Sequence, residues 1–188
     1  MTTKLLILTA LIFSSFAIAN SPSKILSQET AKFEHLSVAD GLSQSSVHCI
    51  FQDSRGFMWF GTLHGLNRYD GYNFTMFHHS PDDSSTLVND RIQTIIEDRL
   101  GNLWIGTIGG VSCLLQESGT FLNYHHDPQN ENSLGSNYII SILQDRSGGI
   151  WIGTRNGLDY LLPNTSGDFR SPEFRHFKHD STDATTLS

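Results

Sequence analysis

The sequence predicts an all-β protein made of about three four-stranded antiparallel β-propeller blades, an incomplete propeller, after a signal peptide. Two observations predict this fold. First, three closely similar segments surround Trp59, Trp104 and Trp151, which lie 45 and 47 residues apart, and a fixed period in the forties is typical of repeat architectures. Second, each repeat divides into four short apolar or β-branched runs separated by Gly, Asp and Asn turns, as in one propeller blade.

The chain is expected to contain five segments. Residues 1–19 form a signal peptide, residues 20–45 a lead-in, and residues 46–90, 91–136 and 137–188 the three repeats. In the first repeat the runs SVHCIFQD, FMWFGT, LNRYD and NFTMFHH are the four predicted strands. The lead-in carries one candidate strand, Phe33–Ser37, which resembles a fourth strand without the three before it. It is interpreted either as a strand lent to a distant blade or as the remnant of a lost one.

Each repeat carries one motif: an Asp, a Gly three residues later, a Trp, and a second Gly two residues after the Trp. We interpret Asp-x-x-Gly as a tight turn, in which the short carboxylate binds backbone amides and the Gly adopts a positive φ. The Trp is expected to fill the wedge between blades, and the second Gly to let the neighbouring sheet approach. The motif is therefore predicted to be structural and not catalytic. Its members are Asp53, Gly56, Trp59 and Gly61, then Asp98, Gly101, Trp104 and Gly106, then Asp145, Gly148, Trp151 and Gly153.

The first residues have the pattern of a secretory signal. Lys4 precedes an apolar run, Leu5–Ala19, that ends in a small-x-small cleavage motif. The run is shorter than the roughly 20 residues that span a bilayer, which favours cleavage after Ala19 over an uncleaved membrane anchor. The residue directly after the cleavage site is Asn20 and not Cys, so a lipoprotein anchor is not expected. The mature chain is predicted to be periplasmic or secreted, without membrane contact.

The charge excludes some partners, and the cysteines leave a choice open. A net charge of −7 argues against unaided binding to nucleic acid or to an anionic membrane surface. Cys49 and Cys113 lie at non-equivalent places, in a first-strand and a third-strand pattern. Export would permit a disulfide, but two buried thiols that pack as small apolar groups are favoured.

Histidines gather at the ends of the three predicted fourth strands, Phe74–His79, Phe121–His126 and Phe174–His179. Imidazoles near carboxylates can bind a transition metal. Because each set belongs to a different repeat, we favour repeated strand ends whose His residues face solvent or cap a turn, and we predict no metal site. No catalytic motif stands out, and no cofactor is expected.

The expected recognition surface lies at the turns between the second and third strands, LHG, IGG and RNG. These turns gather at one face of a propeller, and they vary while the surrounding motif does not. Variation on a fixed scaffold suits ligand recognition, although ordinary polar loop residues would give the same pattern. The candidate ligand-binding residues are His64, Asn67, Arg68, Arg155 and Asn156.

The repeats resemble the propeller repeats of two-component regulator sensors over residues 33–188. The second copy matches over Ile92–Leu114, with Val111 where the pattern has Leu, and the third over Ile139–Tyr160. The resemblance implies a periplasmic propeller that precedes an immunoglobulin-like domain, a membrane helix and a histidine kinase or diguanylate cyclase. In the first repeat the matching residues are Val47, Ile50, Asp53, Gly56, Trp59, Gly61, Thr62, Gly65, Leu66 and Tyr69.

Together these patterns predict a ligand-sensing propeller segment, non-catalytic by itself, and an N-terminal fragment of a larger receptor. The expected partners are a small molecule, with carbohydrate as one class, and either the missing repeats or a second copy. The alternatives are an enzyme propeller of the lyase or glycosidase kind, which would need convergent acid–base groups at the propeller face, and a truncated scaffold without function.

Overall fold

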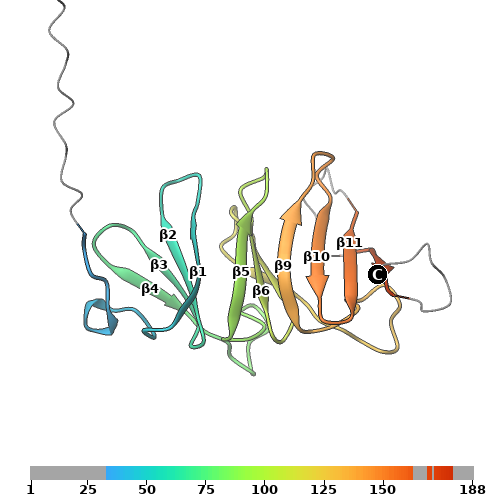
Figure 1. Ribbon diagram of the computed structural model, residues 1–188, viewed down its shortest axis with the longest axis horizontal. Helices are drawn as coiled ribbons and strands as arrows, with labels where there is room; N and C mark the ends of the chain where they lie inside the picture. Colours follow the sequence, from blue (N-terminus) through green and yellow to red (C-terminus); the bar gives the residue numbers. More distant parts are fainter. Residues whose placement is uncertain (1–32, 163–168, 171, 180–188) are drawn as a thin grey trace, which may run out of the picture. The chain divides into compact units, whose positions relative to one another are not determined.

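The computed structural model describes residues 33–162, 169–170 and 172–179. The predicted signal peptide lies outside these residues. Residues 35–188 form one compact unit, whose described part contains three four-stranded antiparallel sheets (Figure 1). The all-β blade prediction is therefore confirmed. The strands are β1 (Val47–Gln52), β2 (Met58–Thr62), β3 (Leu66–Tyr69), β4 (Phe74–Phe77), β5 (Ile92–Glu97), β6 (Leu103–Thr107), β7 (Val111–Leu114), β8 (Phe121–Tyr124), β9 (Ile139–Gln144), β10 (Ile150–Thr154), β11 (Gly157–Leu161) and β12 (Phe174–Phe177).

Each sheet is one blade with its strands in chain order. Blade 1 is β1-β2-β3-β4, blade 2 is β5-β6-β7-β8, and blade 3 is β9-β10-β11-β12. The first strands of successive blades contact one another, β1 with β5 and β5 with β9, so these three strands form the inner row of the assembly (Figure 1). This order places the β2–β3, β6–β7 and β10–β11 turns at the same end of their blades as the segments that enter β1, β5 and β9.

The Asp-x-x-Gly turns have the predicted role and one that the sequence did not predict. In blade 1, Asp53 Oδ1 accepts hydrogen bonds from the backbone amides of Arg55 and Phe57, and Gly56 has a φ of 91°. The other carboxylate oxygen, Oδ2, accepts a hydrogen bond from the Trp59 indole at 3.0 Å. The same indole bond recurs from Trp104 to Asp98 at 2.8 Å and from Trp151 to Asp145 at 2.9 Å. Each Asp therefore fixes both its turn and the Trp of its blade.

Two of the turn carboxylates, Asp53 and Asp145, are held in the charged form. Burial by itself would raise the pKa of Asp53, but hydrogen bonds from Trp59, the Phe57 amide and Arg55 outweigh it and lower the pKa. The pKa of Asp145 lies well below its ordinary value, chiefly because the Ser147 hydroxyl donates to it. A lowered pKa means that the folded state gains stability above the ordinary aspartate pKa of about 3.9, and loses it as the pH falls through the folded value.

The Trp side chains fill the spaces between blades. Trp59 is fully buried among residues of blade 2, including Ile92, and stacks on Phe77. Trp104 is fully buried in the second core, between blades 2 and 3, and stacks on Tyr124. Apolar groups on both sides of each junction are thus removed from water. This burial is the main driving force for the packing of one blade on the next.

The second Gly of the motif receives a side chain of the next blade. A Cβ on Gly61 would lie 2.6 Å from Ile92 Cγ2, and a Cβ on Gly106 would lie 2.7 Å from Ile139 Cγ2. Ile92 and Ile139 are the first residues of β5 and β9, and both are fully buried. The Gly therefore admits a β-branched residue of the next inner strand, a more specific role than the close approach of a sheet that the sequence predicted.

The outer faces of blades 1 and 3 lack the neighbours that the inner junctions have. Ile50 is 60% exposed, whereas its repeat equivalents Ile95 and Ile142 are each 6% exposed. On blade 3, Leu143 is 63% exposed, and Trp151 is half-buried where the other two Trp residues are fully buried. Blade 1 and blade 3 therefore each expose an apolar outer face, and the same positions of the repeat are buried where a neighbouring blade covers them.

Two further predictions concern the lead-in and the cysteines. Phe33–Ser37 is not a strand, because no described blade precedes blade 1 to pair with it; Phe33 is 92% exposed, and Ser37 instead caps the short 3-10 helix Val38–Asp40. Cys49 in β1 and Cys113 in β7 are both free thiols, as favoured. Burial raises the pKa of Cys49 to about 11, so both act as small apolar groups.

Among the described residues no helix is long and apolar enough to cross a membrane.

The turn carboxylates can be tested in blade 2. We expect Asp98→Ala to lower the free energy of unfolding by about 1–2 kcal/mol, because it removes the acceptor for the Trp104 indole and for two turn amides. Urea unfolding monitored by Trp fluorescence measures this change. Asp82→Ala, in the exposed loop after β4, is the matched control. Equal stability of the two variants would show that the turn carboxylate is dispensable.

The exposed outer faces predict that the purified chain self-associates. We expect light scattering to give a mass above that of one chain, because two apolar faces made for burial remain in water. Ile50→Asp and Leu143→Asp should each shift the mass toward the monomer. Ile140→Asp is the control, since Ile140 is 57% exposed on the inner row, where blades 1 and 2 carry His48 and Gln93. A wild-type chain that stays monomeric at all concentrations would contradict this expectation.

Candidate functional site

One end of the blades carries the predicted recognition turns, and we call it the turn face: residues 62–65, 107–110 and 154–157 with the entry segments 43–46, 88–91 and 135–138. Its turns share one backbone design. Thr62 Oγ1 donates to the Gly65 carbonyl at 3.0 Å and accepts the His64 amide at 2.9 Å. Thr107 and Thr154 make the same pair of bonds in blades 2 and 3. The turn is therefore a fixed frame on which the two residues after the Thr can vary.

The entry segments lie against these turns. The amide of Ile108 donates to the Arg91 carbonyl at 3.3 Å, and the amide of Arg155 donates to the Tyr138 carbonyl at 3.0 Å. In blade 1 the Leu63 amide donates to the Gln44 side chain at 3.2 Å. Each blade thus presents a turn and an entry residue together, which places Arg91 and Tyr138 on the same face as the predicted site residues.

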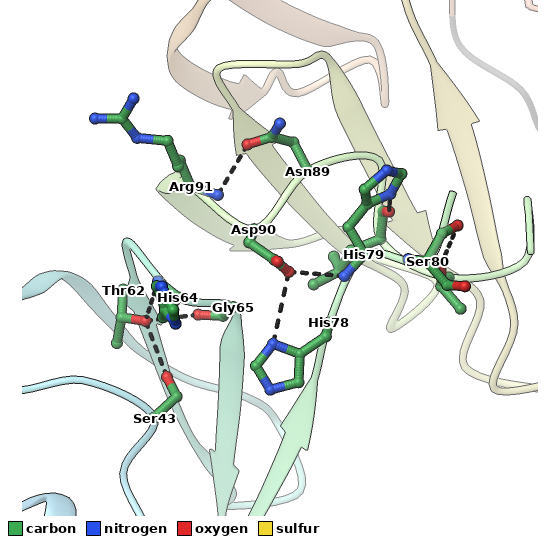
Figure 2. Close-up of polar contacts among 12 residues, drawn as sticks. Ser43, Thr62, His64, Gly65, His78, His79, Ser80, Asn89, Asp90 and Arg91 are labelled. Atoms are coloured by element: carbon green, nitrogen blue, oxygen red, sulfur yellow. Dashed lines mark hydrogen bonds and ion pairs between the residues drawn. The ribbon is translucent and has the colours of Figure 1, made fainter. Parts of the chain in front are cut away.

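Figure 2 shows the polar contacts of the turn face at the junction of blades 1 and 2. Asp90 lies at its centre: Oδ1 accepts the His79 amide at 2.7 Å and lies 3.7 Å from His78 Nδ1. The backbone carbonyl of Asp90 accepts the Gly65 amide at 2.8 Å, which ties the blade 1 turn to the entry of blade 2. His64 is exposed on that turn, and the Arg91 side chain extends away from Asp90 (Figure 2).

Blade 3 presents a different set at the equivalent positions. The guanidinium of Arg155 lies 5.3 Å from the centre of the Tyr138 ring, a cation–π contact. Tyr138 is 38% exposed, and Arg155 and Asn156 are exposed. The structure therefore places three predicted residues, His64, Arg155 and Asn156, on the turn face. The sequence analysis did not predict Tyr138 and Arg91. Both occupy the position directly before the first strand of a blade, and the residue type at this position differs between the blades, which was a usable signal.

Asn67, one of the predicted ligand-binding residues, is buried inside blade 1 and does not reach the exposed part of the turn face. It is fully buried in β3, its Oδ1 accepts the Ser43 amide at 2.9 Å, and its Nδ2 donates to Ser43 Oγ and to the Phe60 carbonyl. The equivalent residues do the same work: Ser112 accepts the Val88 amide and Asp159 accepts the Gly135 amide. This strand position anchors each entry segment to its blade, so its polarity serves the fold.

Arg68 also lies away from the turn face. Its guanidinium is 4.8 Å from the centre of the Phe57 ring and 5.9 Å from that of Trp59. Phe57 directly precedes β2, at the end of the blade opposite the β2–β3 turn. The structure therefore does not bring Arg68 together with His64, and it places Arg68 in the crevice between blades 1 and 2.

The paired histidines anchor the long loops that join the blades. His79 Nδ1 is 2.7 Å from the Leu87 carbonyl, and His126 Nδ1 is 2.6 Å from the Leu134 carbonyl. The His126 amide donates to Asn137, as the His79 amide does to Asp90. The second His of each pair thus caps a loop, as favoured. Among residues 33–162, 169–170 and 172–179, no three His, Cys, Asp or Glu side chains are grouped as metal ligands.

Blade 3 clamps the loop before it with a charged pair. His176 Nδ1 is 2.7 Å from Asp159 Oδ1, and Nε2 is 2.9 Å from the Glu131 carbonyl. Both partners are acceptors, so the ring makes both bonds only when both nitrogens carry hydrogen. Burial would lower the pKa of His176 and the charge of Lys178 also opposes protonation, but the bonds to Asp159 and Glu131 outweigh them and raise the pKa.

The three repeats resemble a known propeller repeat. The family model for the two component regulator propeller matches residues 41–64, 86–109 and 133–156. In each blade the match begins before the entry segment, covers the first two strands and reaches the turn that follows them. Three segments of the chain are therefore similar to the two component regulator propeller repeat. Each match ends within a turn of the turn face.

A histidine kinase and the extracellular domain of a hybrid two component system are among the proteins that resemble the chain. Histidine kinase P4 of Formosa agariphila is 46% identical over 55 residues, 29% of this chain and 4% of the kinase. The extracellular domain of the hybrid two component system BT3049 from B. thetaiotaomicron is 27% identical with a TM-score of 0.68, over 77% of this chain and 20% of that domain. The chain therefore spans a small part of the proteins that it matches.

An enzyme shares the fold at greater distance. Virginiamycin B lyase from Staphylococcus aureus is 15% identical with a TM-score of 0.52, over 75% of this chain and 44% of the lyase. At this identity the likeness shows a propeller fold alone.

The His176 clamp predicts a pH dependence. A raised folded pKa stabilises the protein fully below the ordinary histidine pKa of about 6.5 and loses that contribution as the pH rises through the folded value. We expect His176→Asn, which copies the Asn123 of blade 2, to flatten the change in unfolding free energy between about pH 6 and 8. His64→Asn on the exposed turn is the control. A wild-type profile that is already flat would show that the clamp does not depend on protonation.

Proposed function

We propose that this chain is a ligand-sensing propeller segment of a two-component-type receptor, non-catalytic by itself, that works in the periplasm or outside the cell after removal of residues 1–19. The observation that carries the proposal is the contrast within the turn face. Thr and Gly residues hold the same frame in all three blades, while the side chains that the frame presents to solvent differ from blade to blade.

The chemistry of those side chains supports a polar small molecule as the ligand. Blade 1 offers His64, blade 2 offers Arg91, and blade 3 offers Arg155 and Asn156 beside the half-exposed ring of Tyr138. Hydrogen-bond donors around an exposed aromatic ring suit a hydroxyl-rich molecule with one apolar face, such as a carbohydrate, because the ring covers the apolar face and the donors bind the hydroxyls.

The enzyme alternative depends on acid–base groups that converge on a substrate. The best candidate pair on the turn face is His78 and Asp90. Asp90 Oδ1 already accepts the His79 amide, and its carbonyl ties two blades together, so the residue has a structural task that accounts for its position. The extracellular domain of a two component system, at 27% identity, favours sensing over catalysis.

A binding measurement on the full chain tests the proposal. We expect calorimetry against a panel of neutral oligosaccharides to find a ligand whose Kd rises at least about tenfold, about 1.4 kcal/mol, in Arg155→Ala. Arg146→Ala, exposed in the β9–β10 turn at the opposite end of the same blade, is the matched control. A ligand that Arg155→Ala and Arg146→Ala bind as tightly as wild type would contradict the assignment of the turn face, and conversion of a bound sugar would favour the enzyme.

A further inference from the structure

A cavity between blades 1 and 2, distinct from the turn face, is lined by an arginine, Arg68, that forms no ion pair within the described residues. Arg68 lies in β3, opposite Trp59 on β2 and Thr75 on β4, so its side chain is on the blade 1 face that packs against blade 2. Its guanidinium stacks over Phe57 and near Trp59. These contacts orient the flat face of the group and leave its edge, which carries the N–H donors, free for a ligand.

Arg68 makes no hydrogen bond or ion pair with any residue in the described part of the chain. Asp70 is close enough for the charge of Arg68 to help lower its pKa, but the main causes are hydrogen bonds from the Asn73 and Tyr72 amides. The other arginine at the cavity, Arg55, is paired with Asp53 at 3.2 Å. Arg68 therefore supplies a fixed positive charge whose donors are not used by the fold.

The cavity that Arg68 lines has a volume of about 260 Å³. No Asp or Glu is among its lining residues, and its walls are mostly apolar. A positive charge over apolar walls attracts an anion with an apolar body, because field lines are less screened there than in open water. The lining residues are Arg55, Trp59, Arg68, Thr75, Phe77, Gly101, Leu103, Leu114, Leu115, Gln116 and Gly119.

The next blade junction does not repeat this arrangement. The equivalent of Arg68 in blade 2 is Cys113, which is fully buried in the core between blades 2 and 3. In blade 3 it is Tyr160, whose ring lies 4.4 Å from that of Trp151. Since propeller packing at this position is satisfied by a small thiol, the fold does not itself require an arginine there.

We propose that the cavity between blades 1 and 2 binds a small organic carboxylate, with Arg68 as the principal anion-binding residue. The guanidinium donates two parallel N–H bonds to the carboxylate. Arg55 at the rim keeps its ion pair with Asp53, and the apolar part of the ligand lies against Phe77 and Leu103. The volume is below the usual 300–1,000 Å³ of drug-sized sites, so the ligand is a small acid. This site is independent of the proposed function of the turn face.

Indole resonances provide a direct readout, because Trp59 lines the cavity while Trp104 and Trp151 do not. The full chain, labelled with 15N, is titrated with sodium benzoate and with sodium galacturonate, which separate an aromatic acid from a sugar acid. We expect a saturable shift of the Trp59 indole signal with at least one of them, at concentrations up to about 10 mM, ten times a Kd of about 1 mM. The other two indole signals should stay in place.

Substitutions then assign the charge. Arg68→Met keeps an apolar stem over Phe57 and should abolish the Trp59 shift, whereas Arg155→Met on the turn face should leave it unchanged. Unshifted Trp104 and Trp151 signals in the ligand-free variants show that the fold is intact. The proposal is overturned if neither acid shifts Trp59, if Arg68→Met binds as well as wild type, if uncharged benzamide gives the same shift, or if sodium chloride does, which would indicate an adventitious ion only.

Discussion

The junction between blades is the contact on which the rest of the structure depends. A blade has two apolar faces and cannot bury either by itself. The Trp of one blade and the first inner-strand residue of the next solve this together. At the second junction Trp104 is held by Asp98 while Ile139 enters the space above Gly106. Loss of the acceptor of the indole, or a side chain on the glycine, would weaken the packing of the two sheets.

This packing explains where the chain can and cannot vary. Carboxylates, hydroxyls and amides that lie inside the blades are all committed to turns, entry segments or loops, and no buried side-chain polar atom in the described residues lacks a partner. A buried polar group without a hydrogen bond is costly, so such positions keep one task even when their chemistry changes, as Asn67, Ser112 and Asp159 do. Freedom to change is left to the turn face and to the crevice beside Arg68.

Repetition made most of the fold predictable from the sequence. Period, turn residues and strand lengths predicted the blades, and Asp-x-x-Gly predicted the turns, because these are local rules. The indole bond of Asp53 was not predictable, since it joins residues six apart whose side chains meet only when the strand pairing is known. Asn67 was wrongly placed at the surface for a similar reason: it directly follows the first residue of β3, and its inward direction depends on the lead-in segment that covers it. Tyr138 and Arg91 reach the turn face through contacts with turns that follow them in the chain.

A glycine slot filled by a side chain of the next blade holds neighbouring blades together. Gly106→Ala and Gly153→Ala test it in one chain, because a Cβ at residue 106 would meet Ile139 Cγ2 and Thr94 Cγ2 at 2.7 Å, whereas a Cβ at residue 153 would meet only the Ser141 hydroxyl at 2.6 Å, which can rotate away. Urea unfolding should show a loss of about 1–3 kcal/mol for Gly106→Ala, as for other overpacked cores. For Gly153→Ala we predict no loss, or a gain of about 0.5 kcal/mol from the stiffer strand. Equal effects of the two substitutions would contradict the claim.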